Sequence, residues 1–311
     1  MFQAGDATLG SDGALFRWRI DSRATFILLM MAPAVTLLFA FTIVPFVVSV
    51  WLSLTDYMLA RPPARFIGLG NYAALLAAAE FWKALWISIL FTTLATLAQT
   101  IIGITVAVLL MGAGRSATIL RLIYIAPLAV TPIAVIFTFR MMFNPGLGVF
   151  NYLLRLVGLQ AQDWLGSSGM ALASLVIVDA WQWTPFIVLV VAGGLASLPP
   201  DPFEAARVDG AGPWQIFFYI TLPMLRPFLA IAILFRAIDA FKTFDLIYVL
   251  TGGGPGTSTT TLNVFAFKQA IEFTELGRGS SIAIIIMIII TIVSQIVLRR
   301  SRLLVIKEPD R

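Results

Sequence analysis

The densest group of chemically versatile side chains lies inside an apolar stretch at residues 170–195. It comprises Asp179, Trp181, Gln182, Trp183 and Thr184. Carboxylate and amide groups hydrogen-bond to hydroxyls, and aromatic faces pack against sugar rings, so this composition suits a polyol. If the stretch crosses a membrane, interfacial tryptophans and one hydrogen bond between helices would explain the same residues as well. Asp179, Trp181 and Gln182 are therefore candidate substrate-pathway residues.

The apolar stretch at residues 227–250 carries four charged side chains at intervals of three: Arg236, Asp239, Lys242 and Asp245. A charge inside a bilayer is costly, which makes each of them a candidate functional residue. Neighbours in the series have opposite signs and could neutralise one another along one helix. In the competing interpretation, Asp239 or Lys242 faces a water-filled path, and Asp245 lies near an interface. The sequence leaves both interpretations open.

Neither histidine nor cysteine occurs in the chain. Their absence excludes Ser-His-Asp and Cys-His catalysis, thiolate redox chemistry, disulfides and zinc sites. Carboxylate-only metal sites and lysine-based mechanisms remain open, but no residues cluster to indicate either. The glycine-rich run 251–257 lacks the lysine of a phosphate-binding loop, so this chain is not expected to hydrolyse ATP by that route. We predict no catalytic residue, no metal site and no cofactor bound by this chain.

The amino-acid composition predicts the kind of fold that holds these groups. The chain has 311 residues, of which 59% are hydrophobic and 12% charged, and its mean hydropathy is +0.94. A typical soluble domain has roughly 45–50% apolar and about 25% charged residues. A soluble fold of this size could not hide so much apolar surface. The chain is therefore predicted to be an all-α integral membrane protein.

Six stretches are long enough to cross a bilayer, which takes about 20 mostly apolar residues. They are 24–55, the residues between Lys83 and Arg115, those between Arg121 and Arg140, 170–195, 227–250, and those between Arg278 and Arg299. The first is too long for a signal peptide and lacks a cleavage site of small residues, so we expect it to be retained. The predicted fold has about six transmembrane helices.

The distribution of lysine and arginine predicts the orientation. The N-terminus, the second and fourth connections and the C-terminus hold 12 of these residues, and the other three loops hold seven over longer segments. The positive-inside rule therefore places both termini in the cytoplasm. The net charge of +5 could indicate an acidic partner, but in a membrane protein it more often reflects anionic lipid at the cytoplasmic ends. No stretch interleaves basic and aromatic residues, so no nucleic-acid binding is predicted.

The connection between the fourth and fifth spans, at residues 198–227, has the local chemistry of two short helices. In the first, Asp201 can cap the N-terminus, Pro202 suits the first position and Glu204 completes a capping box. Gly210 can end that helix in a left-handed turn. Pro213 can open the second helix.

The second short helix is predicted to have one apolar face and to end before the fifth span. Its apolar positions recur at helical spacing, and prolines follow them: Trp214, Phe217, Phe218 and Thr221, then Pro223 and Pro227. The loop could simply rest on lipid headgroups as an interfacial amphipathic segment. Alternatively it is a rigid knob that docks into a partner, with small side chains at Ala205 and Ala206 for close approach and a charge at Glu204.

The order of residues in this loop resembles the EAA signature of bacterial ABC importer permeases. Further segments resemble the carbohydrate-type branch of that family, of the maltose and glycerol-phosphate permease kind. The matching residues are Glu204-Ala205-Ala206, Asp209-Gly210-Ala211, Ile220, Leu222, Pro223 and Pro227 in the loop, and 66–72, Phe81-Trp82, Gly148, Asn151, Leu154, Gly158-Leu159, Trp164-Leu165, Phe244-Asp245, 251–255 and 259–261 outside it. The resemblance covers most of residues 26–298.

The resemblance implies a division of the chain into three parts. These are a cytoplasmic segment 1–25, an importer transmembrane domain 26–298 with a coupling loop 198–227, and a cytoplasmic tail 299–311. It also implies that a cytoplasmic coupling helix between the fourth and fifth spans docks on an ATPase. The docking core would be Glu204, Ala205, Ala206, Asp209 and Gly210.

The resemblance further implies a function and a set of partners. The chain would be a non-catalytic permease subunit that moves a carbohydrate, polyol or glycoside across the bacterial inner membrane by alternating access. Its partners would be a second homologous permease, an ATPase dimer that binds ATP and Mg, and an extracytoplasmic solute-binding protein. The alternatives are an ion-coupled secondary transporter, which leaves the 204–227 loop unexplained, and an intramembrane enzyme, which lacks a catalytic cluster. The sequence leaves the particular substrate open.

Overall fold

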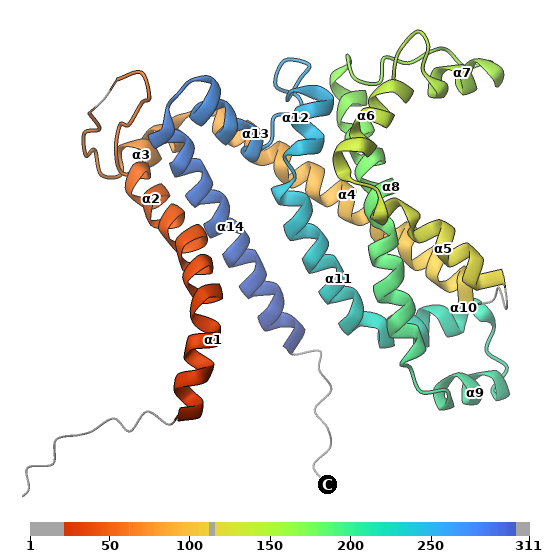
Figure 1. Cartoon of the computed structure of the whole chain (residues 1–311). Coiled ribbons are helices and arrows are strands. Elements are labelled where there is room, and N and C mark those ends of the chain that lie inside the picture. The colour runs from red at the N-terminus through yellow and green to blue at the C-terminus, as the bar shows by residue number, and fades with distance from the viewer. Residues whose placement is uncertain (1–21, 62, 112–115, 303–311) are drawn as a thin grey trace, which may run out of the picture. The chain divides into compact units, whose positions relative to one another are not determined.

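The computed structural model describes residues 22–61, 63–111 and 116–302 (Figure 1). Within these ranges the chain is helical, with two isolated β-bridges and no strand. In chain order the helices are α1 (Ser22–Leu38), α2 (Val44–Ser53), α3 (Gly70–Ala77), α4 (Ala79–Met111), α5 (Ser116–Ala129), α6 (Pro132–Met142), α7 (Val149–Leu156), α8 (Ser168–Ala196), α9 (Asp201–Val208), α10 (Pro213–Ile216), α11 (Leu222–Lys242), α12 (Asp245–Thr251), α13 (Leu262–Phe267) and α14 (Leu276–Arg302). Three π-helical turns join neighbouring helices: η1 (Phe39–Ile43), η2 (Phe217–Thr221) and η3 (Lys268–Glu272).

The chain divides into two units, one up to Val48 and one from Ser49, and each is described by itself. In the first unit, α1 and η1 form an apolar rod whose side chains from Thr25 onward are all exposed. A helix that is hydrophobic all round is typical of a membrane span. With α2 it makes a candidate span of 29 residues, Thr25–Ser53, as the sequence predicted.

Among the described residues, five helices are long and apolar enough to cross a membrane: Thr25–Ser53, Ala79–Leu110, Ser168–Ala196, Pro213–Lys242 and Leu276–Arg299. A sixth crossing is available if the bent pair Ile123–Ala129 and Pro132–Met142 is counted as one span. The prediction of an all-α membrane protein with about six spans is therefore confirmed. The residues 1–21 and 303–311 of the predicted terminal segments lie outside the described residues.

The third predicted span is not one straight helix. α5 and α6 meet at an angle of 109°. Pro132 cannot donate a backbone hydrogen bond, and it disfavours helical geometry at the preceding residue. Thr131 accordingly has an extended ψ of 135°, and Pro132 opens α6. The proline within an apolar run thus produces the break.

The fifth predicted span begins and ends earlier than expected. Pro223 and Pro227 do not separate a short helix from it, because the chain runs from Pro213 through η2 into α11 and on to Lys242. Pro223 lies in the first turn of α11, directly after the π-helical turn, which locally changes the hydrogen-bond pattern that a proline would otherwise interrupt. At the other end the helix stops at Lys242, and α12 starts at Asp245.

The core of the second unit lies around α8, which is its most buried long helix and packs most extensively against α4. Gly103 permits this close approach, since a Cβ atom there would lie 2.6 Å from Cγ2 of Ile187. α11 packs against both α4 and α8. These three helices carry most of the polar residues discussed below.

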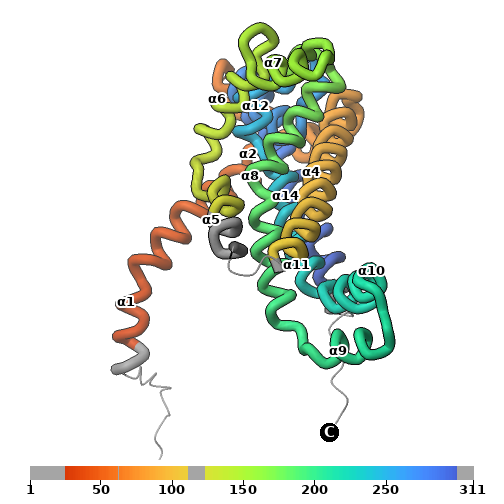
Figure 2. Tube along the Cα trace, turned by 90° about the vertical axis from the view of Figure 1, so that its right-hand side faces the viewer, coloured from red at the N-terminus to blue at the C-terminus, as the bar shows by residue number. Residues whose placement is uncertain are grey.

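The second unit has two distinct ends. Figures 1 and 2 place α9 and α10 at one end, together with the last turns of α14, and α7, α12 and α13 at the other. The short helices of the 198–227 loop therefore lie opposite the glycine-rich turn 251–257 and the connection around α7.

Candidate functional site

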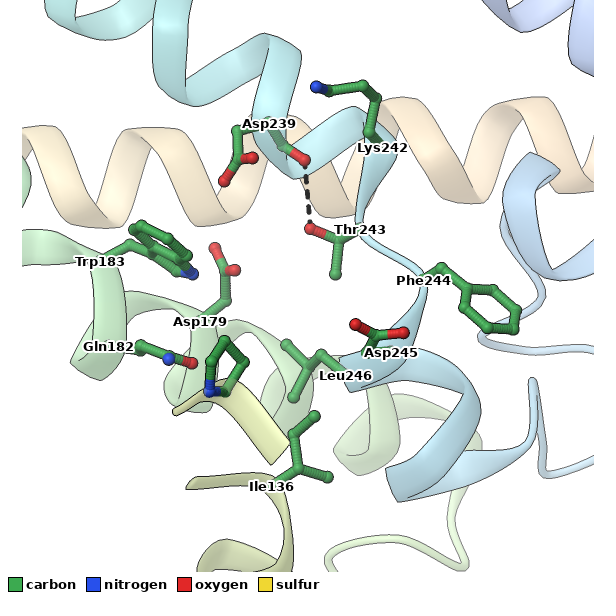
Figure 3. A pocket seen from close by; sticks show the side chains of 11 residues that line it. Ile136, Asp179, Gln182, Trp183, Asp239, Lys242, Thr243, Phe244, Asp245 and Leu246 are labelled. Atoms are coloured by element: carbon green, nitrogen blue, oxygen red, sulfur yellow. Dashed lines mark hydrogen bonds between the residues drawn. The ribbon is translucent and has the colours of Figure 1, made fainter. Parts of the chain in front are cut away.

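A cavity of about 250 Å³ opens between α6, α8 and the junction of α11 with α12 (Figure 3). It combines carboxylates, an amide, an ammonium group and an indole. The lining residues are Pro132, Ile136, Asp179, Gln182, Trp183, Asp239, Lys242, Thr243, Phe244, Asp245 and Leu246. Residues from four helices thus bring the two polar groups singled out in the sequence to one place.

The break after α11 shapes one wall of this cavity. Thr243 has a ψ of 123° and leaves the helix, and its hydroxyl donates to the carbonyl of Asp239 at 3.2 Å (Figure 3). Asn263 Nδ2 donates to the carbonyl of Phe241 at 2.8 Å. These bonds satisfy carbonyls that have no partner within the helix at its C-terminus. The break therefore places Asp239 and Asp245 on one cavity although they belong to different helices.

A buried ion pair links α8 and α11 beside the cavity. Arg236 Nη2 donates to Asp179 Oδ2 at 2.9 Å, and both side chains are 2% exposed. Gln99 of α4 bridges the pair. Its Nε2 donates to Asp179 Oδ2 at 2.6 Å, and its Oε1 accepts from Arg236 Nε at 2.8 Å. Three helices are thus joined through one hydrogen-bonded cluster.

Arg236 makes two further contacts. Its Nη1 donates to Asp239 Oδ2, and its guanidinium carbon lies 5.0 Å from the centre of the Trp183 ring. Asp239 is about half exposed. The guanidinium fork therefore binds two carboxylates in different directions and packs on an aromatic face, which a lysine could not do at once.

The structure brings together four of the five predicted substrate-pathway residues. Asp179, Gln182, Asp239 and Lys242 all line the cavity. Trp181 does not. It is 46% exposed and packs edge-to-face on Phe139 at 5.4 Å. Trp181 and Trp183 are two positions apart on α8, so their side chains point to different faces of the helix. Trp183 occupies the place expected for Trp181.

The predicted charge ladder along the fifth span is only partly present. Arg236 pairs with Asp239, but the described residues show no ion pair between Asp239 and Lys242 or between Lys242 and Asp245. The helix ends between Lys242 and Asp245, so the regular spacing stops there. The main partner of Arg236 is instead Asp179 on another helix. Gln99, from the second predicted span, belongs to the same cluster.

The first short helix of the 198–227 loop forms almost as predicted. Its stop is confirmed: Gly210 has a φ of +78°, its N–H donates to Arg207, and the N–H of Ala211 donates to Ala206 at 2.9 Å. This pair of bonds is the Schellman motif. The predicted cap is wrong by one residue, because Pro200 is the N-cap and Asp201 lies in the first turn without a capping bond.

The coupling residues predicted from the sequence all lie on or directly after this helix. Glu204, Ala205, Asp209 and Gly210 are exposed and Ala206 is half-buried, and no residue of α9 is buried. The second short helix starts at Pro213 as predicted. Gln215 Oε1 accepts from the N–H of Gly212 at 2.7 Å. The loop is therefore ordered by its own local bonds.

The expected aromatic face of the second short helix is present and uncovered. The rings of Trp214, Phe217 and Phe218 contact one another, with Phe217 and Phe218 4.9 Å apart. Trp214 and Phe218 are exposed in the isolated chain. This face and α9 together form an exposed apolar and acidic surface at one end of the second unit.

The opposite end is organised by residues that carried the resemblance. Asn151 is fully buried, donates to the carbonyls of Pro145 and Gln162, and accepts at Oδ1 from Trp164 Nε1 at 2.9 Å. The glycine-rich turn is held similarly, since the hydroxyl of Thr260 donates to the carbonyl of Gly253 at 2.9 Å. These residues fix loops and do not line the cavity. Among the described residues, no group of acidic side chains is placed to hold a metal ion.

The comparisons with known proteins agree on one family. Residues 99–302 match the family described as the binding-protein-dependent transport system inner membrane component. The trehalose/maltose transport system permease protein MalF of Thermococcus litoralis is 37% identical over 262 residues, which cover 84% of this chain and 88% of that protein. The sulfoquinovosyl glycerol transport system permease protein SmoG of Agrobacterium fabrum is 34% identical over 284 residues, which cover 91% and 92%.

Solved structures share the fold. A chain in the crystal structure of a bacterial alginate ABC transporter, in complex with an alginate pentasaccharide-bound periplasmic protein, aligns with a TM-score of 0.80 at 19% identity and covers 92% of this chain and 97% of its own. Permease relatives of this kind support the importer interpretation over the ion-coupled secondary transporter. With two thirds of its length matched and relatives more than 30% identical, the chain belongs to the family of binding-protein-dependent transport system inner membrane components.

Proposed function

We propose that this chain is the permease subunit of an ATP-driven ABC importer that carries a carbohydrate, polyol or glycoside by alternating access. The observation that carries the proposal is the cavity in which Asp179, Asp239, Gln182 and the ring of Trp183 meet between the helices. Hydrogen-bonding groups next to an aromatic face suit a sugar. The relative named for trehalose/maltose supports a sugar, and the one named for sulfoquinovosyl glycerol, an anionic glycoside, supports the wider class of glycosides.

The proposal assigns α9 as the coupling helix, with Glu204, Ala205, Ala206, Asp209 and Gly210 as its docking core. Two features support the assignment. No residue of α9 is buried, so its surface is available to a partner. The Schellman turn at Gly210 also makes the helix end rigid, as a segment that transmits force requires.

A direct mechanical path leads from the loop to the cavity. The helical run from Pro213 to Lys242 is continuous, and it carries Arg236 and Asp239 near its far end. From Pro213 to Asp239 it spans about 40 Å at 1.5 Å per residue. Closure of two ATPase subunits on ATP would displace α9 and α10, and this helix would carry the displacement to the cavity walls. Substrate release and rebinding would follow from that movement.

The remaining parts of the importer would be separate proteins. We assign to them a second homologous permease, an ATPase dimer that binds ATP and Mg, and an extracytoplasmic solute-binding protein. This chain would then be non-catalytic, with lipid around its exposed apolar helices. We place it in a bacterial inner membrane, with residues 1–25 and 299–311 cytoplasmic and residues 26–298 as the transmembrane domain.

Co-purification and reconstitution test the proposal. The complete chain, purified with its partners, should retain an ATPase subunit and support ATP-dependent sugar uptake in proteoliposomes. Deletion of residues 201–213 should abolish both while the chain still inserts. A matched deletion in the connection at the other end, residues 159–163, should leave the ATPase subunit bound. Uptake by the chain alone, without any ATPase, would contradict the proposal.

A further inference from the structure

The residue that organises the cavity walls does not line the cavity. Arg236 is 2% exposed and lies behind the wall. It donates hydrogen bonds to Asp179 and Asp239, and its guanidinium lies over the ring of Trp183. These three partners all line the cavity. One buried cation therefore fixes three lining groups at once.

The bonds of this cluster occupy one oxygen of each carboxylate. Oδ2 of Asp179 accepts from both Gln99 and Arg236, and Oδ2 of Asp239 accepts from Arg236. In the part of the chain that the structure describes, no hydrogen bond reaches Oδ1 of either residue. An ionised carboxylate can accept through both oxygens. Each Oδ1 thus has unused acceptor capacity, and both residues line the cavity.

Gln99 gives the cluster a fixed orientation. It is fully buried, and its amide group both donates to Asp179 and accepts from Arg236. Its Nε2 also donates to the backbone carbonyl of Asp179 at 3.1 Å. Because both ends of the amide are used, neither the carboxylate nor the guanidinium can rotate without losing a bond. The Oδ1 atoms therefore keep one direction.

The charges around the cavity disfavour a negatively charged ligand. Asp179, Asp239 and Asp245 line it, against Lys242 in the lining and Arg236 behind it, which leaves an excess of one negative charge. Among the described residues, Lys242 forms no ion pair with any of these carboxylates. An anionic ligand would meet like charges in a region of low dielectric, where they repel strongly. A neutral ligand with hydroxyl donors would not.

We propose that Arg236 is a positioning residue that presents Asp179 Oδ1, Asp239 Oδ1 and the Trp183 ring to the substrate, and that the cavity thereby selects neutral over anionic sugars. This inference rests on the proposed import of a carbohydrate. It narrows the substrate to neutral polyols and glycosides.

The test is ATP-driven uptake by the complete importer in proteoliposomes. Radiolabelled trehalose and maltose serve as neutral probes, with trehalose 6-phosphate and maltobionate as their anionic counterparts. The wild type should carry at least one neutral probe and prefer it over its counterpart by about tenfold or more. Because the solute-binding protein is the same in every sample, a change between variants reports on this chain.

Arg236→Lys keeps the charge but loses the guanidinium fork. The KM for the neutral probe should rise about tenfold or more, and the maximal rate should fall by less than that. The ratio of neutral to anionic uptake should move toward one. Asp239→Asn, at a half-exposed position, removes one negative charge and should move the preference in the same direction. Arg155→Lys, outside the cavity and the cluster, is the matched control and should change neither quantity.

Three results decide the matter. An Arg236→Lys variant with fewer folded molecules but unchanged KM and preference would show a structural role only, and would overturn the inference. Wild-type uptake of the anionic probes equal to that of the neutral ones would also overturn it, and would assign Lys242 to an anionic substrate. ATP-independent uptake would instead overturn the proposed function.

Discussion

Arg236 Nη2 lies 2.9 Å from Asp179 Oδ2, and this ion pair joins two helices across 57 positions of the chain. Both side chains are 2% exposed. An unpaired charge in such a place would be costly, so each group stabilises the ionised form of the other. The pair therefore couples the packing of α8 and α11 to the electrostatics of the cavity.

The coupling can be measured by neutralising the partners singly and together. Arg236→Gln alone should lower the free energy of unfolding by about 3–5 kcal/mol, because it leaves the buried carboxylate of Asp179 without a cation. Asp179→Asn alone should cost less, because Arg236 keeps Asp239 as its partner. The double variant should lose less than the sum of the two. Thermal unfolding of the purified chain in detergent, followed by tryptophan fluorescence, measures all three.

An exposed ion pair provides the control. Arg278 Nη1 lies 3.6 Å from Glu275 Oε2, and both side chains are about one-third exposed. Glu275→Gln should therefore cost less than about 1 kcal/mol. If the losses of Asp179→Asn and Arg236→Gln simply add in the double variant, the two residues do not interact energetically.

The sequence predicted the residues of this cluster better than their pairing. Opposite charges at intervals of three along residues 236–245 indicate a ladder on one helix, and Arg236 with Asp239 forms its first step. The bond from Arg236 to Asp179 depends on how α8 and α11 pack. No local spacing encodes that arrangement. A usable signal was still present, since a lone Asp179 in one apolar span requires a cation from another.

Helix boundaries were predictable where a charge or glycine marks them and less so where prolines do. Gly210 ends α9 as expected, because the helix ends in a left-handed turn and glycine adopts that conformation most easily. Pro132 breaks the third span, whereas Pro223 and Pro227 are accommodated in the fifth. All three residues are prolines in apolar runs, so the residue type alone does not predict which of them breaks a helix. The difference arises from the preceding turn, which is extended at Thr131 and π-helical at Phe217–Thr221.

The two tryptophans of α8 should respond differently to the same substitution. Trp183 lines the cavity and packs on Arg236, whereas Trp181 packs on Phe139 outside it. Trp183→Phe should raise the KM for sugar uptake by roughly tenfold, since a phenyl ring offers a smaller face to sugar and cation alike. Trp181→Phe should leave KM unchanged. Equal effects on KM would contradict the assignment of Trp183 to the site.

The left-handed turn after α9 should be needed for coupling and not for insertion. Proline cannot adopt the φ of +78° found at Gly210, so Gly210→Pro should break the Schellman turn. ATP-driven uptake and retention of the ATPase subunit should be lost while the amount of membrane-inserted chain stays the same. Uptake in proteoliposomes, co-purification of the ATPase and immunoblots of membranes measure the three quantities.

Gly158 provides an unusually close control for that substitution. It has a φ of +77° and ends α7 by the same pair of bonds, from Gly158 to Arg155 and from Leu159 to Leu154. Gly158→Pro should disturb the connection at the other end of the second unit but leave the ATPase subunit bound. If both variants lose the ATPase, a general folding defect explains the result.

Reversing one charge on α9 tests the docking surface more gently. Glu204 is exposed and its side chain bonds to no other described residue, so Glu204→Lys should not disturb the fold. It should abolish uptake by opposing a basic surface on the ATPase. Glu80→Lys, an exposed acidic residue in the first turn of α4, serves as the control. Normal uptake with Glu204→Lys would remove the basis for the docking core.

The absence of cysteine allows the orientation to be tested without background labelling of this chain. Val208 in α9 is 88% exposed and Leu147, two residues before α7, is 94% exposed. α9 and α7 lie at opposite ends of the second unit (Figure 1). A membrane-impermeant maleimide should label Val208→Cys only in inside-out vesicles and Leu147→Cys only in right-side-out vesicles. The positive-inside rule gives this expectation, because the predicted topology assigns 12 lysines and arginines to the side of the 198–227 loop and seven to the other side. The reverse pattern would place α9 outside the cell, where no ATPase subunit could reach it, and would exclude both the orientation and the coupling role together.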